Sequence, residues 1–253
     1  MNCRIALLGA VLFATPVAAQ TDFRNLDRGR PTRVEDAYPV EHYEFELAFG
    51  YHVARLAPGR TQHLFEPELT YGPLPNLDLG VGTAFAVTGR GYGLAGLRFS
   101  AKYNLTTEQP WLPGVAFRID AALPLGSEAG SGTVGLASLL ATRSFGPNRI
   151  HFNASAGLGR QNRAGAAEPM PQWRAALAVD RTLYRTSTLL VLDIVAEQGW
   201  NGDAATLSPG IALRRQVTPT LVFDAGMRFH HSAFAMGISY AFAVAGLMPG
   251  GGR

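Results

Sequence analysis

Cysteine is almost missing from this chain, which has a single cysteine, Cys3, among 253 residues. That residue lies in a stretch with the features of a leader peptide, so the mature chain would have none. A chain without cysteine has no disulfide framework, no thiol nucleophile and no cysteine-based metal site. It must be stabilised by hydrogen-bonded secondary structure and burial, and we expect neither a metal nor another cofactor.

Runs of like charge are missing as well. The chain has 22 lysine and arginine residues, 19 aspartate and glutamate residues and a formal net charge of +3. The basic residues are scattered along the chain, and only one of them is a lysine, Lys102. Proteins that bind nucleic acids concentrate basic residues on one face or segment. The composition therefore predicts no nucleic-acid partner.

The sequence also lacks an apolar run long enough for a transmembrane helix, which needs about 20 residues. Its start has Arg4, a short apolar stretch at 5–14, and small residues that end at Ala19. This order is typical of a secretory signal peptide, whereas a membrane anchor would need a longer stretch. We predict a signal peptide at residues 1–19, cleaved after Ala19, and an exported mature protein.

The rest of the chain divides by pattern. Residues 20–40 are polar, contain two prolines and show no periodicity, which predicts a loosely ordered periplasmic lead-in. From residue 41 to 245 the pattern becomes strand-like, with segments bounded by Gly, Pro or Asn. Residues 246–253 are predicted to form a flexible C-terminal tail.

Residues 41–245 lack helical periodicity and show a period of two instead. In YEFELAFGYHVA (43–54), aromatic and aliphatic residues occupy every second position, with Glu44, Glu46 and His52 between them. Twelve segments of this kind follow one another, at 43–54, 63–71, 76–88, 97–105, 115–123, 133–145, 149–160, 172–184, 187–199, 205–216, 219–230 and 233–245. The even number and the regular spacing predict an all-β, antiparallel, up-and-down arrangement.

Alternating strands can bury the apolar face in a soluble sandwich, or turn it outward into lipid around a polar lumen. The connections favour the second arrangement, because several short turns with Pro alternate with longer polar or Gly-rich loops, although 106–114 is long on the short-turn side. Aromatic residues near strand ends and the Gly, Ala and Ser of the opposite face agree with it. We therefore predict a transmembrane β-barrel of about 12 strands at residues 41–245, in the bacterial outer membrane and in contact with its lipid.

Four stretches carry a resemblance to a known family: FEPELTYGPLPNLDLGVG (65–82), GLAGLRFSAKYNL (93–105), PGVAFRIDAALPLG (113–126) and FGPNRIHFNASAGLG (145–159). They resemble the outer-membrane transporter family named for the meta-cleavage pathway of phenol degradation. One place departs from the family's pattern, since Ala95 and Gly96 stand where members commonly have a Gly-Asp pair. The resemblance implies an outer-membrane barrel of a Gram-negative bacterium and links it to the uptake of aromatic compounds.

Charged residues of the polar faces are candidates for the lining of the lumen. The acidic candidates come from three neighbouring strands and are Glu44, Glu46, Glu66, Glu68 and Asp78. The basic candidates come from the next two strands and are Arg98, Lys102 and Arg118. Opposed walls of charge could orient a dipolar solute or select ions. The alternative is a set of ion pairs that fills a narrow barrel.

The sequence thus predicts a non-enzymatic barrel that passes or binds small molecules, such as apolar or aromatic compounds, through a narrow charged lumen. A structural or interaction barrel with a closed lumen is the alternative. A lipid hydrolase is a third possibility, because His230 and Ser232 would share one face of a strand, but a serine hydrolase also needs a group that orients the histidine. The histidines and acidic residues near residues 42–63 do not have the spacing of a known metal site.

Overall fold

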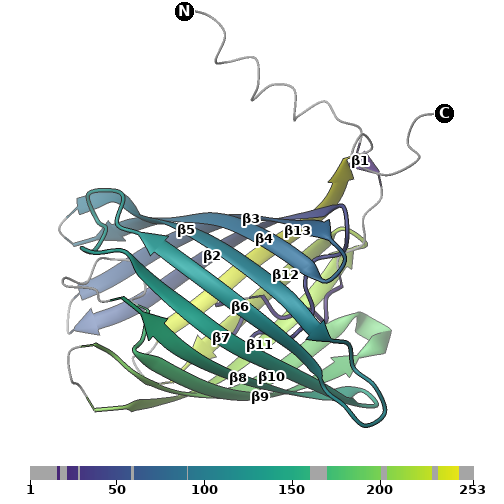
Figure 1. Ribbon diagram of the computed structural model, residues 1–253. Coiled ribbons are helices and arrows are strands. Elements are labelled where there is room, and N and C mark those ends of the chain that lie inside the picture. The colour runs from purple at the N-terminus through teal and green to yellow at the C-terminus, as the bar shows by residue number, and fades with distance from the viewer. Residues whose placement is uncertain are drawn as a thin grey trace, which may run out of the picture.

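The wall of the protein is a closed antiparallel β-barrel. The computed structural model describes residues 16–17, 22–27, 29–57, 60–89, 91–159, 170–200, 204–229 and 233–244. Its 12 long strands follow one another around the barrel in chain order, and β13 pairs with β2 to close it (Figure 1). The predicted fold class is confirmed.

The strands that form the wall are β2 (Glu44–Ala57), β3 (Arg60–Leu74), β4 (Leu77–Thr88), β5 (Gly91–Thr106), β6 (Gly114–Leu123), β7 (Val134–Phe145), β8 (Asn148–Leu158), β9 (Trp173–Leu183), β10 (Thr188–Gln198), β11 (Thr206–Thr218), β12 (Leu221–Arg228) and β13 (Ala233–Val244). One short 3₁₀-helix, η2 (Tyr184–Thr186), connects β9 and β10. Among the described residues, no helix has the length and apolar character to cross a membrane.

Two predicted regions fall largely outside the described residues. Of the predicted signal peptide, the structure describes only β1 (Pro16–Val17), which pairs with Val244 and Ala243 at the end of β13. The predicted tail at 246–253 lies outside the described residues altogether.

The two ends of the barrel differ in their connections. At one end, which we call the turn end, β3–β4 and β7–β8 are joined by two residues each, and Asn76 and Gly146 there have positive φ. Asparagine and glycine adopt this backbone conformation more readily than other residues. At the other end, the loop end, β6–β7 and β8–β9 are joined by 124–133 and 159–172. The exception is 107–113, a longer connection at the turn end, which also matches the sequence pattern.

The two faces of the wall follow the predicted alternation. On β2, the Phe49 side chain points outward and is 49% exposed, whereas its near neighbour Glu46 points inward and is 8% exposed. The same contrast separates Phe117 from Arg118 on β6. The outer face is therefore mainly apolar, as expected of a surface that contacts lipid, and most charged side chains of the strands face inward.

The lead-in predicted at residues 20–40 differs from the structure. Residues 22–27 and 29–40, which we call the plug, lie inside the barrel, drawn in purple in Figure 1. Val34, Asp36 and Ala37 are fully buried there. Because plug residues form hydrogen bonds with β2, β5, β6, β7, β8 and β10, the plug crosses the lumen rather than covering one side of it.

The plug enters and leaves at the turn end. The Arg149 guanidinium, near the start of β8, donates to the carbonyl oxygen of Arg24. The chain then reaches toward the loop end, where Arg33 pairs with Glu197 near the end of β10. It returns to the turn end at Tyr38, whose hydroxyl donates to Glu108. The plug is thus a loop inserted into the lumen, with Arg30 to Arg33 at its tip.

Apolar packing holds one side of the plug against the wall. Leu26 and Val34 pack against the inward-facing apolar residues of three strands, which are Ala176, Ala178, Leu189, Val191, Val195 and Ala212. Glycines make room on the opposite side, because a side chain at Gly50 or Gly237 would collide with Arg30. The aperiodic polar sequence of the plug follows from this position, since its residues meet many strands in turn and have no single buried face.

Candidate functional site

The predicted lumenal charges all lie on inward-facing positions of the wall. Lys102, Arg118 and Asp78 are 6%, 5% and 2% exposed, and Arg98 and Glu66 are about one-fifth exposed by side chain. The predicted acidic and basic walls meet in ion pairs: Lys102 Nζ lies 3.7 Å from Asp78 Oδ2, Arg118 Nη2 lies 3.8 Å from Glu68 Oε1, and Arg98 Nη1 lies 4.0 Å from Glu66 Oε1.

The plug contributes an acidic residue that sequence reasoning did not include. Glu35 Oε1 lies 2.7 Å from Arg118 Nη1 and 3.2 Å from Lys102 Nζ, which are shorter distances than those to the wall acids Glu68 and Asp78. The basic residues of β5 and β6 therefore bind the plug as well as the neighbouring wall. Because charge-assisted hydrogen bonds between buried groups are strong, this contact fixes the returning half of the plug.

Further ion pairs attach the plug around the barrel. Arg30 Nη1 lies 3.5 Å from Asp224 Oδ2 on β12, and Arg149 Nη1 on β8 lies 3.6 Å from Asp36 Oδ2. Arg214 on β11 pairs with Asp27. The plug carries charges of both signs, so its acids pair with arginines of the wall and its arginines pair with acids of the wall. This complementarity shows why a polar segment is retained inside the barrel.

Glu44 and Glu46 do not join the ion pairs of β5 and β6. They line a cavity at the turn end together with Asp22, Arg24 and Glu41, with about 920 Å³ of empty space that includes space open to solvent. The predicted acidic wall is therefore divided into two parts, one beside the plug's return and one at the turn-end mouth.

A hydrogen-bonded latch connects the plug to the turn-end connection 107–113. Glu108 accepts hydrogen bonds from the Tyr38 hydroxyl at 3.1 Å, from the Ser144 backbone N–H at 2.7 Å and from the Ser144 hydroxyl at 2.8 Å. Partial burial by itself would raise the pKa of Glu108, but these hydrogen bonds and Arg143 outweigh it and lower the pKa. Burial and the neighbouring Glu108 carboxylate raise the pKa of Tyr38 to about 12, so Tyr38 remains a donor at neutral pH.

The latch predicts a pH dependence of the plug's last turn. A carboxylate with a lowered pKa in the folded state stabilises that state above its ordinary pKa of 4.5, and the contribution disappears as the pH falls through the lowered value. We expect backbone amide exchange at residues 37–43, corrected for intrinsic rate, to become faster below pH 4.5 in the wild type. In Glu108→Gln the exchange should already be faster at pH 7 and should lose this pH dependence. Equal protection in both proteins at pH 7 would contradict the latch.

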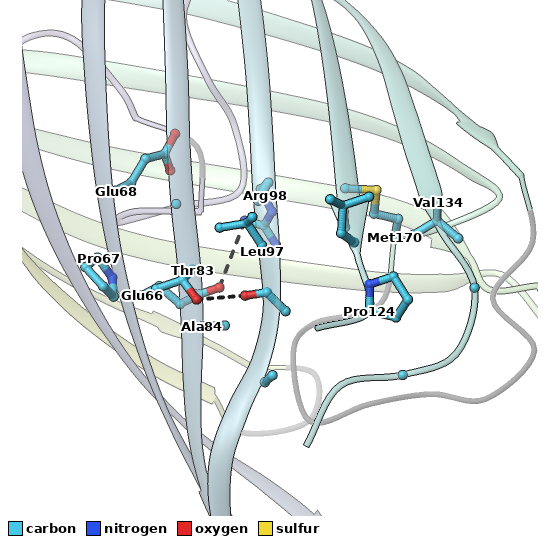
Figure 2. A pocket seen from close by; sticks show the side chains of 17 residues that line it. Glu66, Pro67, Glu68, Thr83, Ala84, Leu97, Arg98, Pro124, Val134 and Met170 are labelled. Carbon is cyan, nitrogen blue, oxygen red and sulfur yellow. Dashed lines mark hydrogen bonds and ion pairs between the residues drawn. The ribbon is translucent and has the colours of Figure 1, made fainter. Parts of the chain in front are cut away.

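The loop-end half of the lumen contains a recess lined by residues of β3–β7, by the β6–β7 connection and by Met170. It has about 630 Å³ of empty space, including space open to solvent, and Figure 2 shows Glu66, Glu68 and Arg98 with Val134 and Met170 around it. The recess therefore combines apolar side chains with a few charged groups, a composition typical of small-molecule sites.

The recess lies at a break in the β3–β4 ladder. Phe65 pairs with Phe85, and Glu68 pairs with Gly82. Between these pairs, Glu66 and Pro67 of β3 do not pair with the facing residues of β4. Pro67 occupies this gap, and proline has no N–H to donate to the facing carbonyl. Pro67, Thr83 and Leu97, which occupy outward-facing positions, line the recess together with inward-facing residues. The recess is thus lined by residues from both faces of the wall.

The next pair of strands is irregular at the same level. The register between β4 and β5 shifts after Ala84, which leaves Ala95 as an extra residue beside Gly96, whose φ is +143°. The Thr83 hydroxyl donates to the carbonyl oxygen of Gly96 at 2.8 Å, as Figure 2 shows. Ala95 and Gly96 are the positions at which the sequence departs from the resembled family. A β-bulge at this point bends β5 and weakens the wall beside Pro67.

A buried threonine, histidine and aspartate resemble the members of a hydrolytic triad. His151 Nε2 lies 2.8 Å from Asp180 Oδ2, and His151 Nδ1 lies 3.0 Å from the Thr142 hydroxyl oxygen. The plug covers them, because the Thr142 hydroxyl oxygen also accepts the Ala37 N–H at 3.1 Å. His151 and Thr142 are fully buried. These three residues hold the plug and leave no room for a substrate.

The sequence also raised a lipid hydrolase and a metal site as possibilities. His230 and Ser232, considered for lipid hydrolysis, lie outside the described residues. In the described part of the chain, no three histidine, cysteine or acidic side chains gather in a group that could hold a metal ion.

Known proteins share this fold at low sequence identity. An outer membrane channel from Pseudomonas putida F1 matches with a TM-score of 0.59 and 11% identity, over 86% of this chain and 99% of that one. The KdgM porin matches with a TM-score of 0.55 and 9% identity, over 77% and 98% of the two chains. The NanC porin matches with a TM-score of 0.53 and 8% identity, over 78% and 98%.

The comparisons define a class of fold. No protein-family model matches the chain, and no curated protein matches it by sequence. The protein is a transmembrane β-barrel with the fold of these outer-membrane porins and channels. In this chain the closed barrel has 12 strands.

Proposed function

We propose that this protein is an outer-membrane barrel that passes small apolar or aromatic molecules from the loop-end recess through the weakened wall at Pro67. The observation that carries this proposal is the recess itself, which is lined from both faces of the wall at a break in the β3–β4 ladder. The plug fills the axial path of the barrel. A solute that enters at the loop end therefore meets a side exit before it meets an open lumen.

The orientation in the membrane supports this route. Short turns of outer-membrane barrels face the periplasm and longer loops face the exterior, which places the recess on the exterior side. Cleavage of residues 1–19 during export belongs to the same proposal. An apolar solute that leaves through the wall would enter the hydrocarbon of the membrane, where it is soluble.

The lining supports apolar or aromatic solutes over highly charged ones. Leu97, Val134 and Met170 supply apolar contact area, while Arg98 and Glu66 partly neutralise each other. The resemblance to the meta-pathway transporter family points to the same class of solute, and membership of that family is part of this proposal. A KdgM porin structure contains oligogalacturonate, a polar solute, in a barrel of the same class.

Replacing Pro67 tests the route. Pro67→Ala restores a backbone N–H to β3, so we expect the β3–β4 ladder to close and passage of apolar probes to fall severalfold. The assay is the uptake of N-phenyl-1-naphthylamine, an apolar aromatic dye, by cells whose outer membrane contains the barrel. Wild-type cells should take up the dye faster than cells without the barrel.

The matched control is Pro209→Ala on β11, where proline pairs with Ile194 in an intact ladder. This variant should take up the dye at the wild-type rate. Equal uptake by wild-type and Pro67→Ala cells, at equal amounts of folded barrel, would exclude the side exit. Uptake that does not depend on the barrel at all would exclude the proposed function.

A barrel with a closed lumen and a structural or interaction role is the second candidate. The plug favours it, since its buried ion pairs on several strands fill the axial path. The two candidates differ at the recess, because only the transport function requires the break at Pro67.

A further inference from the structure

The outer wall has an apolar hollow on the side where the barrel closes. It extends over β11, β12, β13, β2 and β3, with about 1100 Å³ of empty space that includes space open to the surroundings. The side chains around it include Leu213, Phe223, Met236, Phe49 and Phe65. All of these occupy outward-facing positions, so the hollow belongs to the surface that contacts lipid.

A small residue creates the hollow. Ala225 points outward on β12, where it pairs with Leu213 on β11 and Met236 on β13. Its neighbours are large apolar side chains, whereas its own methyl group leaves the backbone of the wall uncovered. The depression is lined mainly by apolar side chains, as contact with an acyl chain requires.

A cation lies at the turn-end side of the hollow. Arg215 lines it, is exposed, and occupies an outward position three residues before the end of β11. In the part of the chain that the structure describes, no ion pair joins Arg215 to an acidic side chain. Arg185 of η2 adds a second exposed cation close by, since β10 begins two residues after η2 and its Thr188 pairs with Arg215. Arginine on a lipid-facing strand is uncommon, and a cation near the membrane surface attracts anionic headgroups.

We propose that this hollow is a binding site for an anionic phospholipid, with its phosphate on Arg215 and an acyl chain over Ala225. The turn end faces the periplasm in this class of barrel, so the available phosphates there belong to the phospholipid leaflet. The charge of Arg215 complements the headgroup, and the apolar floor complements the chain. Such a lipid would cover the region where β13 and β2 close the barrel. The site lies on the outer wall and does not depend on transport through the recess.

The test is native mass spectrometry of the full-length barrel in mild detergent, titrated with phosphatidylglycerol or phosphatidylcholine. We expect phosphatidylglycerol to bind the wild type more tightly than phosphatidylcholine. Arg215→Gln should weaken phosphatidylglycerol binding about fivefold, the effect of one cation near a membrane surface. Ala225→Leu, which fills the hollow, should weaken the binding of both lipids.

Two variants serve as controls, with folding checked by heat-dependent mobility on gels. Arg181→Gln removes an outward-facing arginine near the turn end of β9, and Ala141→Leu enlarges an outward-facing alanine on β7. Both lie outside the hollow and should bind lipid like the wild type. Equal losses in Arg215→Gln and Arg181→Gln, or unchanged binding in Ala225→Leu, would overturn the site. Binding of lipopolysaccharide that depends on Arg215, with none of phosphatidylglycerol, would overturn its assignment to phospholipid.

Discussion

Deletion of residues 22–40 is expected to convert a nearly closed barrel into an open pore, with single-channel conductance in planar bilayers rising about tenfold. The plug fills the lumen through buried residues and pairs with arginines of several strands, including Arg118 and Arg149. Once it is removed, water and ions occupy its place, and the uncovered charges of the wall become hydrated. The wall itself should persist, because its backbone hydrogen bonds run between strands and do not involve the plug.

A point substitution tests the same idea without shortening the chain. Val34 is fully buried against the apolar side of the lumen, so Val34→Asp would place a carboxylate among Val191, Val195 and their neighbours. An unpaired buried charge is costly, and the plug should leave its position rather than retain it. Val34→Ala removes apolar contacts without adding charge and should keep conductance low. If folded barrels of both the deletion and Val34→Asp conduct like the wild type, the plug does not control the axial path.

The wall could be predicted from the sequence because each strand obeys one rule at every second residue. A position such as Phe49 or Phe117 faces lipid and must be apolar, while Glu46 or Arg118 faces the interior and need not be. The difference in connection lengths then separated the two ends. The weakness at Pro67 was also predictable in part, because proline cannot donate to a ladder, but its alignment with the bulge at Ala95 depends on register across three strands.

The plug could not be recognised by periodicity, because its residues face different strands in turn. Leu26 and Val34 pack against inward-facing apolar residues of β9, β10 and β11, whereas Glu35 and Asp36 form ion pairs with arginines on β6 and β8. A signal did exist in the charges. The segment from 22 to 36 is rich in both acids and arginines, and inward positions of later strands carry Arg149, Arg214 and Asp224, which need partners inside the barrel. Matching these two sets of charges would have placed the segment in the lumen.

Arg118 is the residue whose removal should destabilise the barrel most strongly among the lumenal charges. Its guanidinium lies 2.7 Å from Glu35, 3.0 Å from Asp120 and 3.8 Å from Glu68, and its side chain is 7% exposed. Arg118→Met keeps much of the volume but leaves these carboxylates without their main cation. Removal of one partner of a buried ion pair typically costs about 3–5 kcal/mol, and access of water to the lumen places our expectation near the lower end, about 3 kcal/mol. The measurement is urea-induced unfolding in lipid vesicles, followed by tryptophan fluorescence.

Two further variants provide a control and identify which contact of Arg118 stabilises the barrel. Arg98→Met removes a cation that is 22% exposed and contacts Glu66 only at 4.0 Å, so its cost should be below about 1 kcal/mol. Combining Arg118→Met with Glu35→Gln should recover part of the loss, because the neutral amide no longer needs the cation. A double-mutant cycle with zero coupling would assign the stability to Asp120 and the wall alone. A positive coupling would show that the plug and the wall stabilise each other through Arg118, so that opening the lumen necessarily weakens the barrel.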